Sequence, residues 1–306
     1  MQLTDYPVLL TEGAIVERLK QHGGITLDPY VNHATAIYDH PTVLGRLYDE
    51  YVAIAELYDL PLLIMTPTRK VNVESVKRCK YSDRNIAKDS VIFLRQIAGR
   101  HGSFALKVFV GGLLGCKGDA YDASCALGCE EAYEFHRPQV EQFARSGVDY
   151  LFAGIMPALS EAMGMAKAMG ESGLPYIISF MVRKDGCLID GTSIADAIAT
   201  IDDRVAARPT YYMANCIHPK NLVIALEHPC NQGLNRSRFV GIQANASSLS
   251  PEELNNSTCV RQESFDEMVE GMAYLKEQHH LRIFGGCCGT DGVFIDKLAG
   301  YLKGAD

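Results

Sequence analysis

The sequence predicts an α/β fold, a single (β/α)8 TIM barrel that residues 1–306 form as one domain. The main observation is a unit that recurs along the chain, in which a short apolar, β-rich run precedes a stretch with helical periodicity. A doubly wound open sheet is the alternative, but it normally has spaced, phosphate-binding glycines after its first strand. The segment Thr11-Glu12-Gly13-Ala14-Ile15 lacks that pattern, and no Pro-, Ser- or Gly-rich linker divides the chain.

The predicted strands and helices alternate from one end of the chain to the other. The strands are Val8–Leu10, Leu62–Met65, Phe104–Val110, Tyr150–Phe152, Tyr176–Val182, Tyr211–Met213, Phe239–Gln243 and Arg282–Phe284. The helices are about Thr42–Tyr58, Asp83–Gly99, Glu130–Ser146, Leu159–Glu171, Ser193–Ala207, Pro219–Glu227, Ser264–Gln278 and Gly292–Leu302. Thr192 or Ser193 can cap its helix, and Ser264 stands three residues before Glu267, the spacing of a capping box.

Composition narrows the class of partner. The net charge of −8 is spread along the chain, which argues against nucleic acid or an anionic membrane surface as the main partner. No apolar run approaches the length of a membrane span, and the first residues do not resemble an export signal. Ten cysteines in a chain of this kind predict reduced thiols and a cytoplasmic location.

Three cysteines fall at strand ends that a barrel brings together. Cys287 and Cys288 are adjacent within a glycine-rich turn after the eighth predicted strand, and Cys216 follows the sixth. Active sites of (β/α)8 barrels lie at the carboxyl ends of the strands, so these sulfurs are expected to converge. Three thiolates suit Zn²⁺ and leave one coordination position open, which predicts a zinc site.

A thiolate-rich zinc site favours chemistry on sulfur. Such an ion lowers the pKa of an incoming thiol and binds it as thiolate, a good nucleophile toward a methyl group. Zinc-activated water is the alternative chemistry. Buried cysteines that merely pack, or a Cys287–Cys288 disulfide in a redox protein, are the remaining interpretations.

The string Gly285-Gly286-Cys287-Cys288-Gly289-Thr290, with Asn215-Cys216 upstream, resembles the homocysteine S-methyltransferase family. The resemblance extends over nearly the whole chain and implies a zinc-dependent enzyme that methylates a thiol, homocysteine to methionine in that family. It implies Cys216, Cys287 and Cys288 as zinc ligands. It also indicates Glu12, Asn215 and Asn245 as substrate-binding residues.

Four positions depart from the family pattern. Glu12 stands where the family has Asp, Pro67 replaces an Asn, Gly154 takes the place of a substrate-binding carboxylate, and Gln243 that of a tyrosine. Because a buried ammonium needs a partner, two hypotheses follow. Either Glu12 supplies the charge for an amino acid thiol, or the acceptor is a different thiol.

The methyl donor is expected to be a small molecule or a partner corrinoid protein, because no corrinoid module is expected after the barrel. A barrel subunit or thiol-binding protein that acts only with such a partner is therefore the alternative function. The loop from Gly111 to Cys129 is long enough for an active-site lid, and its Tyr121 can help shape the acceptor pocket. Cys125 and Cys129 could share a second metal, and His218 could line the site or begin a helix.

Overall fold

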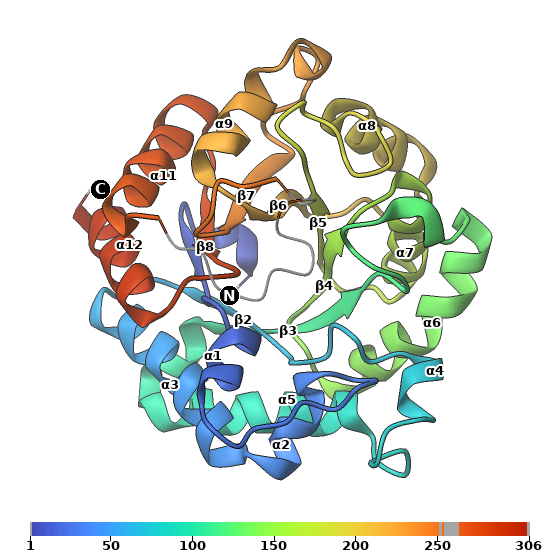
Figure 1. Cartoon of the computed structure of the whole chain (residues 1–306), viewed down its shortest axis with the longest axis vertical. Helices are drawn as coiled ribbons and strands as arrows, with labels where there is room; N and C mark the ends of the chain where they lie inside the picture. The colour runs from blue at the N-terminus through green and yellow to red at the C-terminus, as the bar shows by residue number, and fades with distance from the viewer. Residues whose placement is uncertain (1, 251–252, 254–262, 305–306) are drawn as a thin grey trace.

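Eight parallel strands form a closed barrel in the computed structural model, which describes residues 2–250, 253 and 263–304 (Figure 1). They are β1 (Leu9–Thr11), β2 (Leu62–Met65), β3 (Val108–Gly115), β4 (Tyr150–Met156), β5 (Tyr176–Met181), β6 (Tyr211–Ile217), β7 (Phe239–Ala244) and β8 (Ile283–Gly286). Each strand pairs with the next, and β8 pairs with β1 through Leu9–Ile283 and Leu10–Phe284. The closure confirms the predicted barrel, because an open doubly wound sheet would leave two edge strands unpaired.

Helices surround the barrel, and all eight predicted ones are present (Figure 1). They are α3 (Pro41–Leu57), α5 (Ile86–Ala98), α6 (Cys129–Ser146), α7 (Leu159–Glu171), α8 (Ile194–Arg204), α9 (Pro219–Glu227), α11 (Phe265–His279) and α12 (Gly292–Gly304). Shorter pieces were not predicted: α1 (Val16–Gln21), α2 (Ala36–Asp39), α4 (Val73–Val76), η1 (Leu3–Asp5), η2 (His33–Thr35), η3 (Gly99–Lys107), η4 (Ala123–Cys125) and η5 (Pro229–Asn231).

One of the two predicted helix caps forms. Ser193 Oγ accepts the Asp196 backbone N–H at 3.0 Å and caps α8. Ser264 precedes α11, but its side chain makes no capping hydrogen bond. The predicted capping box is therefore absent. Glu267 instead forms an ion pair with Lys220 of α9 at 2.5 Å, which directs its carboxylate away from the start of its own helix.

The third strand begins and ends later than predicted. The segment before it, Gly99–Lys107, is a kinked 3₁₀ stretch, and β3 continues through Gly111 and Gly112 to Gly115. A Cβ atom at Gly111 would collide with the Tyr150 ring, and one at Gly112 would lie 2.6 Å from Phe143. The glycines therefore accommodate neighbouring aromatic rings instead of starting a loop.

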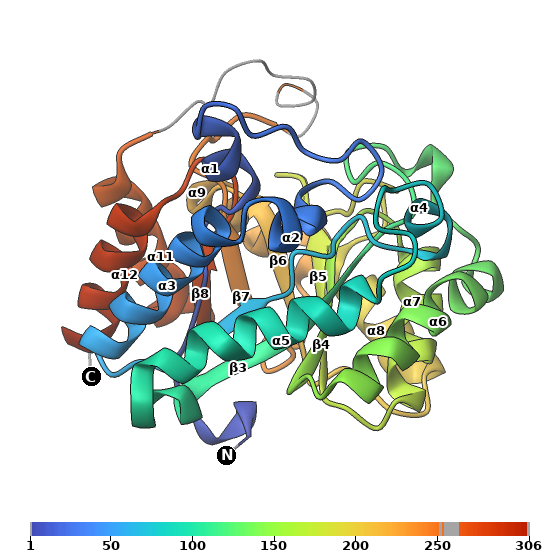
Figure 2. The same ribbon diagram turned by 90° about the horizontal axis from the view of Figure 1, so that it is seen from below.

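The barrel interior is packed up to the level of its mouth. Its apolar cluster consists of Leu3, Leu9, Leu63, Met65, Phe109, Tyr150, Phe152, Ile177, Tyr211, Met213, Val240 and Ile283. Leu3 belongs to η1, which closes the end of the barrel opposite to α1 (Figure 2). The buried polar side chains of Glu12, Asn215 and Gln243 lie at the other end, at the carboxyl ends of β1, β6 and β7.

Candidate metal and substrate site

The sulfur atoms of Cys216, Cys287 and Cys288 lie within 4.8 Å of one another at the mouth of the barrel. Cys287 and Cys288 directly follow β8, as predicted. Cys216 was expected after the sixth strand but lies inside β6, which is longer than its apolar run suggested. Within the residues that the structure describes, these three cysteines are the one group of its kind that could hold a metal ion.

A bulge in β6 directs Cys216 toward the other two cysteines. Its φ of 57° lies in the left-handed region, and the register with β7 shifts between Asn215 and Ile217. Bulges of this kind redirect a side chain at the end of a strand. After β8 the Cys287 N–H donates to the Ala244 carbonyl at 2.7 Å, so the vicinal pair is anchored to β7.

The three thiols differ in pKa. Hydrogen bonds from Cys287 and Cys288 lower the pKa of Cys216, and its thiolate raises the pKa of both partners. Asn245 Nδ2 also donates to Cys216 Sγ at 3.3 Å, and Tyr121 Oη lies 3.7 Å from the same sulfur. Three thiolates this close need a cation to offset their repulsion, and this donor set fits Zn²⁺.

A cavity of about 260 Å³ opens beside the vicinal cysteines. Its charged and polar lining residues are Glu12, Glu17, Lys20, Asn32, His33, Thr66, Arg69, Asn215, Gln243, Cys287 and Cys288. The carboxylates of Glu12 and Glu17 come from the β1 end and α1, while the guanidinium of Arg69 comes from the loop after β2. The cavity thus offers both signs of charge near a cluster of thiols.

Glu12 is the buried acid of the cavity. One of its carboxylate oxygens accepts the Met65 backbone N–H at 2.8 Å, and the residues that the structure describes give it no ion pair. Burial raises its pKa from 4.5 to about 8, because the ionised form loses water without gaining a cation. An ammonium group on a ligand would supply that missing charge.

The amides of Asn215 and Gln243 form a polar chain across the mouth. Asn215 Oδ1 accepts the Ile155 N–H at 3.1 Å, and its Nδ2 donates to Gln243 Oε1. Gln243 Nε2 donates to Thr11 Oγ1 at 3.0 Å, so the chain connects β4, β6, β7 and β1. Asn215 and Gln243 face the cavity, whereas Asn245 contacts Cys216.

The surroundings of Gly154 are apolar. A Cβ at this position would lie 2.8 Å from Leu113 Cδ1 and 3.3 Å from the Phe152 ring. The carboxylate that the family pattern places here therefore has no counterpart at this position, and Glu12 is the buried acid of the cavity. Glu17 and Arg69 were missed, although a charged residue soon after a predicted strand of a barrel is a signal for a residue at the mouth.

The loop from β3 to α6 reaches the cysteines through Tyr121. Buried Glu161 of α7 holds this loop by accepting the Lys117 N–H at 2.7 Å and the Leu127 N–H at 3.4 Å. His136 Nε2 lies 3.0 Å from the same carboxylate. The loop is therefore held in a defined position that brings Tyr121 to the cysteines.

Other candidate residues lie apart from the site. Cys125 is exposed, and the described part of the chain gives it and Cys129 no third metal ligand. His218 caps α9 by accepting the Lys220 N–H at 3.3 Å, which supports its structural interpretation. The nine described cysteines are free, while Cys259 lies outside the described residues. Among the helices of the described ranges, none combines the length and apolar character that a membrane span requires.

Several known proteins are similar to this chain over most of its length. Homocysteine S-methyltransferase YbgG of Bacillus subtilis is 22% identical over 98% of this chain and 96% of its own length. Bovine betaine–homocysteine S-methyltransferase 1 is 21% identical over 98% of this chain and 74% of its own. The metallated form of the Escherichia coli homocysteine methyltransferase MmuM superposes with a TM-score of 0.76 at 21% identity, over 98% of both chains. Residues 9–302 match the model of the homocysteine S-methyltransferase family, and the chain therefore belongs to that family.

Proposed function

We propose that this protein transfers a methyl group to the thiol of homocysteine, giving methionine, with zinc held by Cys216, Cys287 and Cys288. The observation that carries the proposal is the convergence of the three sulfurs within 4.8 Å beside a charged cavity. Zinc bound there would lower the pKa of the acceptor thiol and keep it as thiolate at neutral pH.

The protein's own residues position the metal ligand and the acceptor. Asn245 supports the ligand set by its hydrogen bond to Cys216, which fixes that sulfur at the bulge in β6. Glu12 offers a buried carboxylate for the ammonium group of the acceptor and so replaces the acid that is missing at Gly154. An acceptor held by its sulfur at the zinc site and by its ammonium group at Glu12 would have the sulfur aligned for an in-line attack on the methyl carbon.

Metal analysis and activity test this proposal together. We expect about one zinc per chain in the wild type and in Cys125→Ser, whose exposed sulfur lies outside the cluster. Cys287→Ser should lose most of the metal, and with it the methylation of homocysteine by S-methylmethionine or betaine. Equal zinc content in the wild type and Cys287→Ser would contradict the site assignment.

A different acceptor thiol is the second candidate, and the apolar surroundings of Gly154 favour it. A thiol without an amino group would leave Glu12 without a function in binding. Methylation of 1-propanethiol as efficiently as of homocysteine would support this alternative. Methylation that requires an added corrinoid protein would instead support a partner-dependent subunit.

A further inference from the structure

The cavity beside the cysteines contains a guanidinium group to which the described part of the chain gives no partner. Arg69 is half-buried and lines the cavity, yet within residues 2–250, 253 and 263–304 its side chain forms no hydrogen bond or ion pair. Lys20, an exposed lysine that lines the same cavity, is equally unpaired in that part of the chain. Glu12 and Glu17 line the cavity too, but neither approaches these cations closely enough to form an ion pair.

The backbone of Arg69 is fixed by the strand beside it. Thr68 Oγ1 donates to the Leu113 carbonyl at 2.7 Å, and the Leu113 N–H donates to Thr66 Oγ1 at 3.0 Å. Thr66 Oγ1 in turn donates to Thr68 Oγ1 at 2.7 Å, because the Thr68 proton is already used. A Cβ on Gly115 would collide with the Arg69 carbonyl, so this glycine permits the close approach. The backbone that carries the guanidinium is therefore fixed before any ligand arrives.

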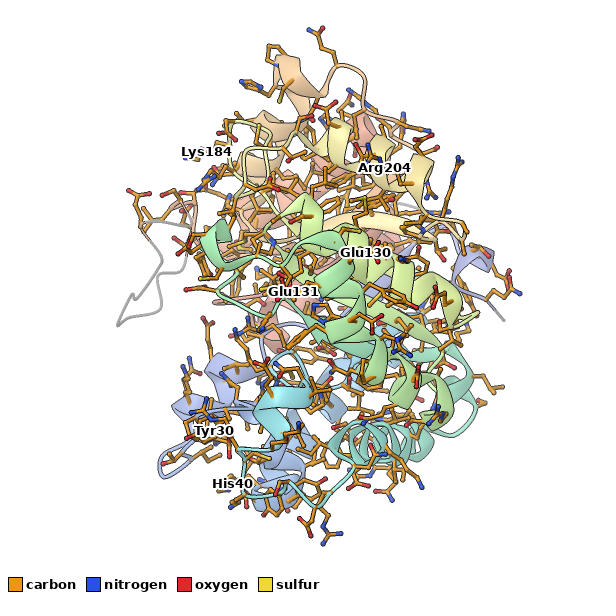
Figure 3. All side chains as sticks on the ribbon, turned by 90° about the vertical axis from the view of Figure 1, so that its right-hand side faces the viewer. Tyr30, His40, Glu130, Glu131, Lys184 and Arg204 are labelled. Carbon is orange, nitrogen blue, oxygen red and sulfur yellow. The ribbon has the colours of Figure 1, made fainter. Side chains whose placement is uncertain are left out.

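Two further polar atoms at this end of the cavity lack partners. His33 is 5% exposed and its Nδ1 is buried without a hydrogen bond, as is Asn32 Oδ1, within the described ranges. Burial, and then the charge of Arg69, lower the pKa of His33 to about 3, so its ring is neutral and able to donate one hydrogen bond. In the segment that carries both residues, Tyr30 lies at the surface (Figure 3). The Arg78 guanidinium lies 4.2 Å from the centroid of its ring.

We propose that Arg69, assisted by His33, binds the carboxylate of a substrate in this cavity. A planar guanidinium on a fixed backbone matches a carboxylate, and the unpaired nitrogen of His33 can add a hydrogen bond as a donor. The inference rests on the proposed methyl transfer. It adds that one of the two substrates carries a carboxylate that Arg69 recognises. That carboxylate belongs either to the acceptor thiol or to the methyl donor, since both must enter the cavity.

Matched pairs of substrates distinguish the two sources. The donor pair is dimethylsulfonioacetate and its carboxamide, which keeps the sulfonium but lacks the carboxylate. The acceptor pair is L-homocysteine and 3-aminopropane-1-thiol, which keeps the amino group but lacks the carboxylate. Zinc-loaded wild type, Arg69→Gln and Arg69→Lys are compared by kcat/KM and by Kd from calorimetry. Arg145→Gln, which removes an exposed cation of α6, is the control.

Arg69→Gln should weaken kcat/KM and binding about 10- to 100-fold for the carboxylate member of one pair and leave the member without a carboxylate nearly unchanged. Arg69→Lys should restore part of that preference, and Arg145→Gln should match the wild type. If Arg69→Gln affects both members of each pair equally, or neither, the inference is overturned. Because calorimetry does not need turnover, a protein that binds these compounds but transfers no methyl group contradicts the proposed function while still testing Arg69.

Discussion

Cys216 combines a metal-ligand side chain with a backbone conformation that favours glycine. Its φ of 57° costs on the order of 1 kcal/mol for a residue with a Cβ atom. The strain coincides with the bulge that directs the sulfur into the cluster, so the strained residue is also the one that the proposed chemistry needs.

A pair of substitutions at this residue measures the strain. In zinc-free protein, Cys216→Gly should have a free energy of unfolding about 1 kcal/mol above that of Cys216→Ala, because both remove the sulfur and only alanine keeps the Cβ. Urea unfolding of the two variants gives the difference. Equal stabilities would mean that the bulge relaxes without the thiol.

Glu12 should make stability depend on pH. Its pKa in the folded protein is about 8, above the ordinary 4.5, so folding favours the protonated form. The free energy of unfolding should therefore fall as pH rises from about 4.5 to about 8, by on the order of 5 kcal/mol relative to Glu12→Gln. Unfolding of zinc-free wild type and Glu12→Gln at pH 5 and pH 8 measures this, with the exposed Glu134→Gln as control. Parallel pH profiles for wild type and Glu12→Gln would contradict the burial of an unpaired acid.

At the scale of elements, the loop between β3 and α6 depends on one buried carboxylate. Glu161, which is fully buried, accepts the N–H groups of Lys117 and Leu127 and contacts the buried His136. Glu161→Ala would leave these groups unpaired and should destabilise the protein by about 3 kcal/mol.

Hydrogen exchange should localise that effect. We expect faster exchange over residues 117–127 in Glu161→Ala, with a smaller increase in Glu161→Gln, whose amide oxygen still accepts one N–H. The exposed Glu171→Ala on the same helix is the control, because its carboxylate contacts only Tyr133 at the surface. Uniform acceleration along the chain would show that Glu161 stabilises the whole barrel instead of the loop.

Elements with two buried faces were predictable, and the connections between them were not. Leu62–Met65 is apolar throughout because the interior and the helix layer cover its two faces, and the structure reproduces its bounds. The convergence of Cys216 with the vicinal pair followed from the barrel topology alone. Arg69 lies in a turn and His33 in the three-residue η2, both too short to show periodicity, so only the folded chain brings them to one cavity.

On the scale of the whole molecule, the closed barrel predicts one cooperative unit. Every strand is hydrogen-bonded on both sides, and the helices pack around a continuous sheet (Figure 1). We propose that residues 1–306 unfold in a single transition, which calorimetry and fluorescence should report at the same temperature. Two separate transitions would divide the chain into domains and contradict the barrel as a single domain.

The packed interior beneath the amides of Asn215 and Gln243 has a kinetic consequence. The cavity has a floor, since the apolar cluster with Leu3 blocks the far end of the barrel. Ligands that bind beside the cysteines therefore enter and leave from the other end of the barrel. We predict ordered binding, in which the thiol enters first and its methylated product leaves last, and product-inhibition kinetics would test this order.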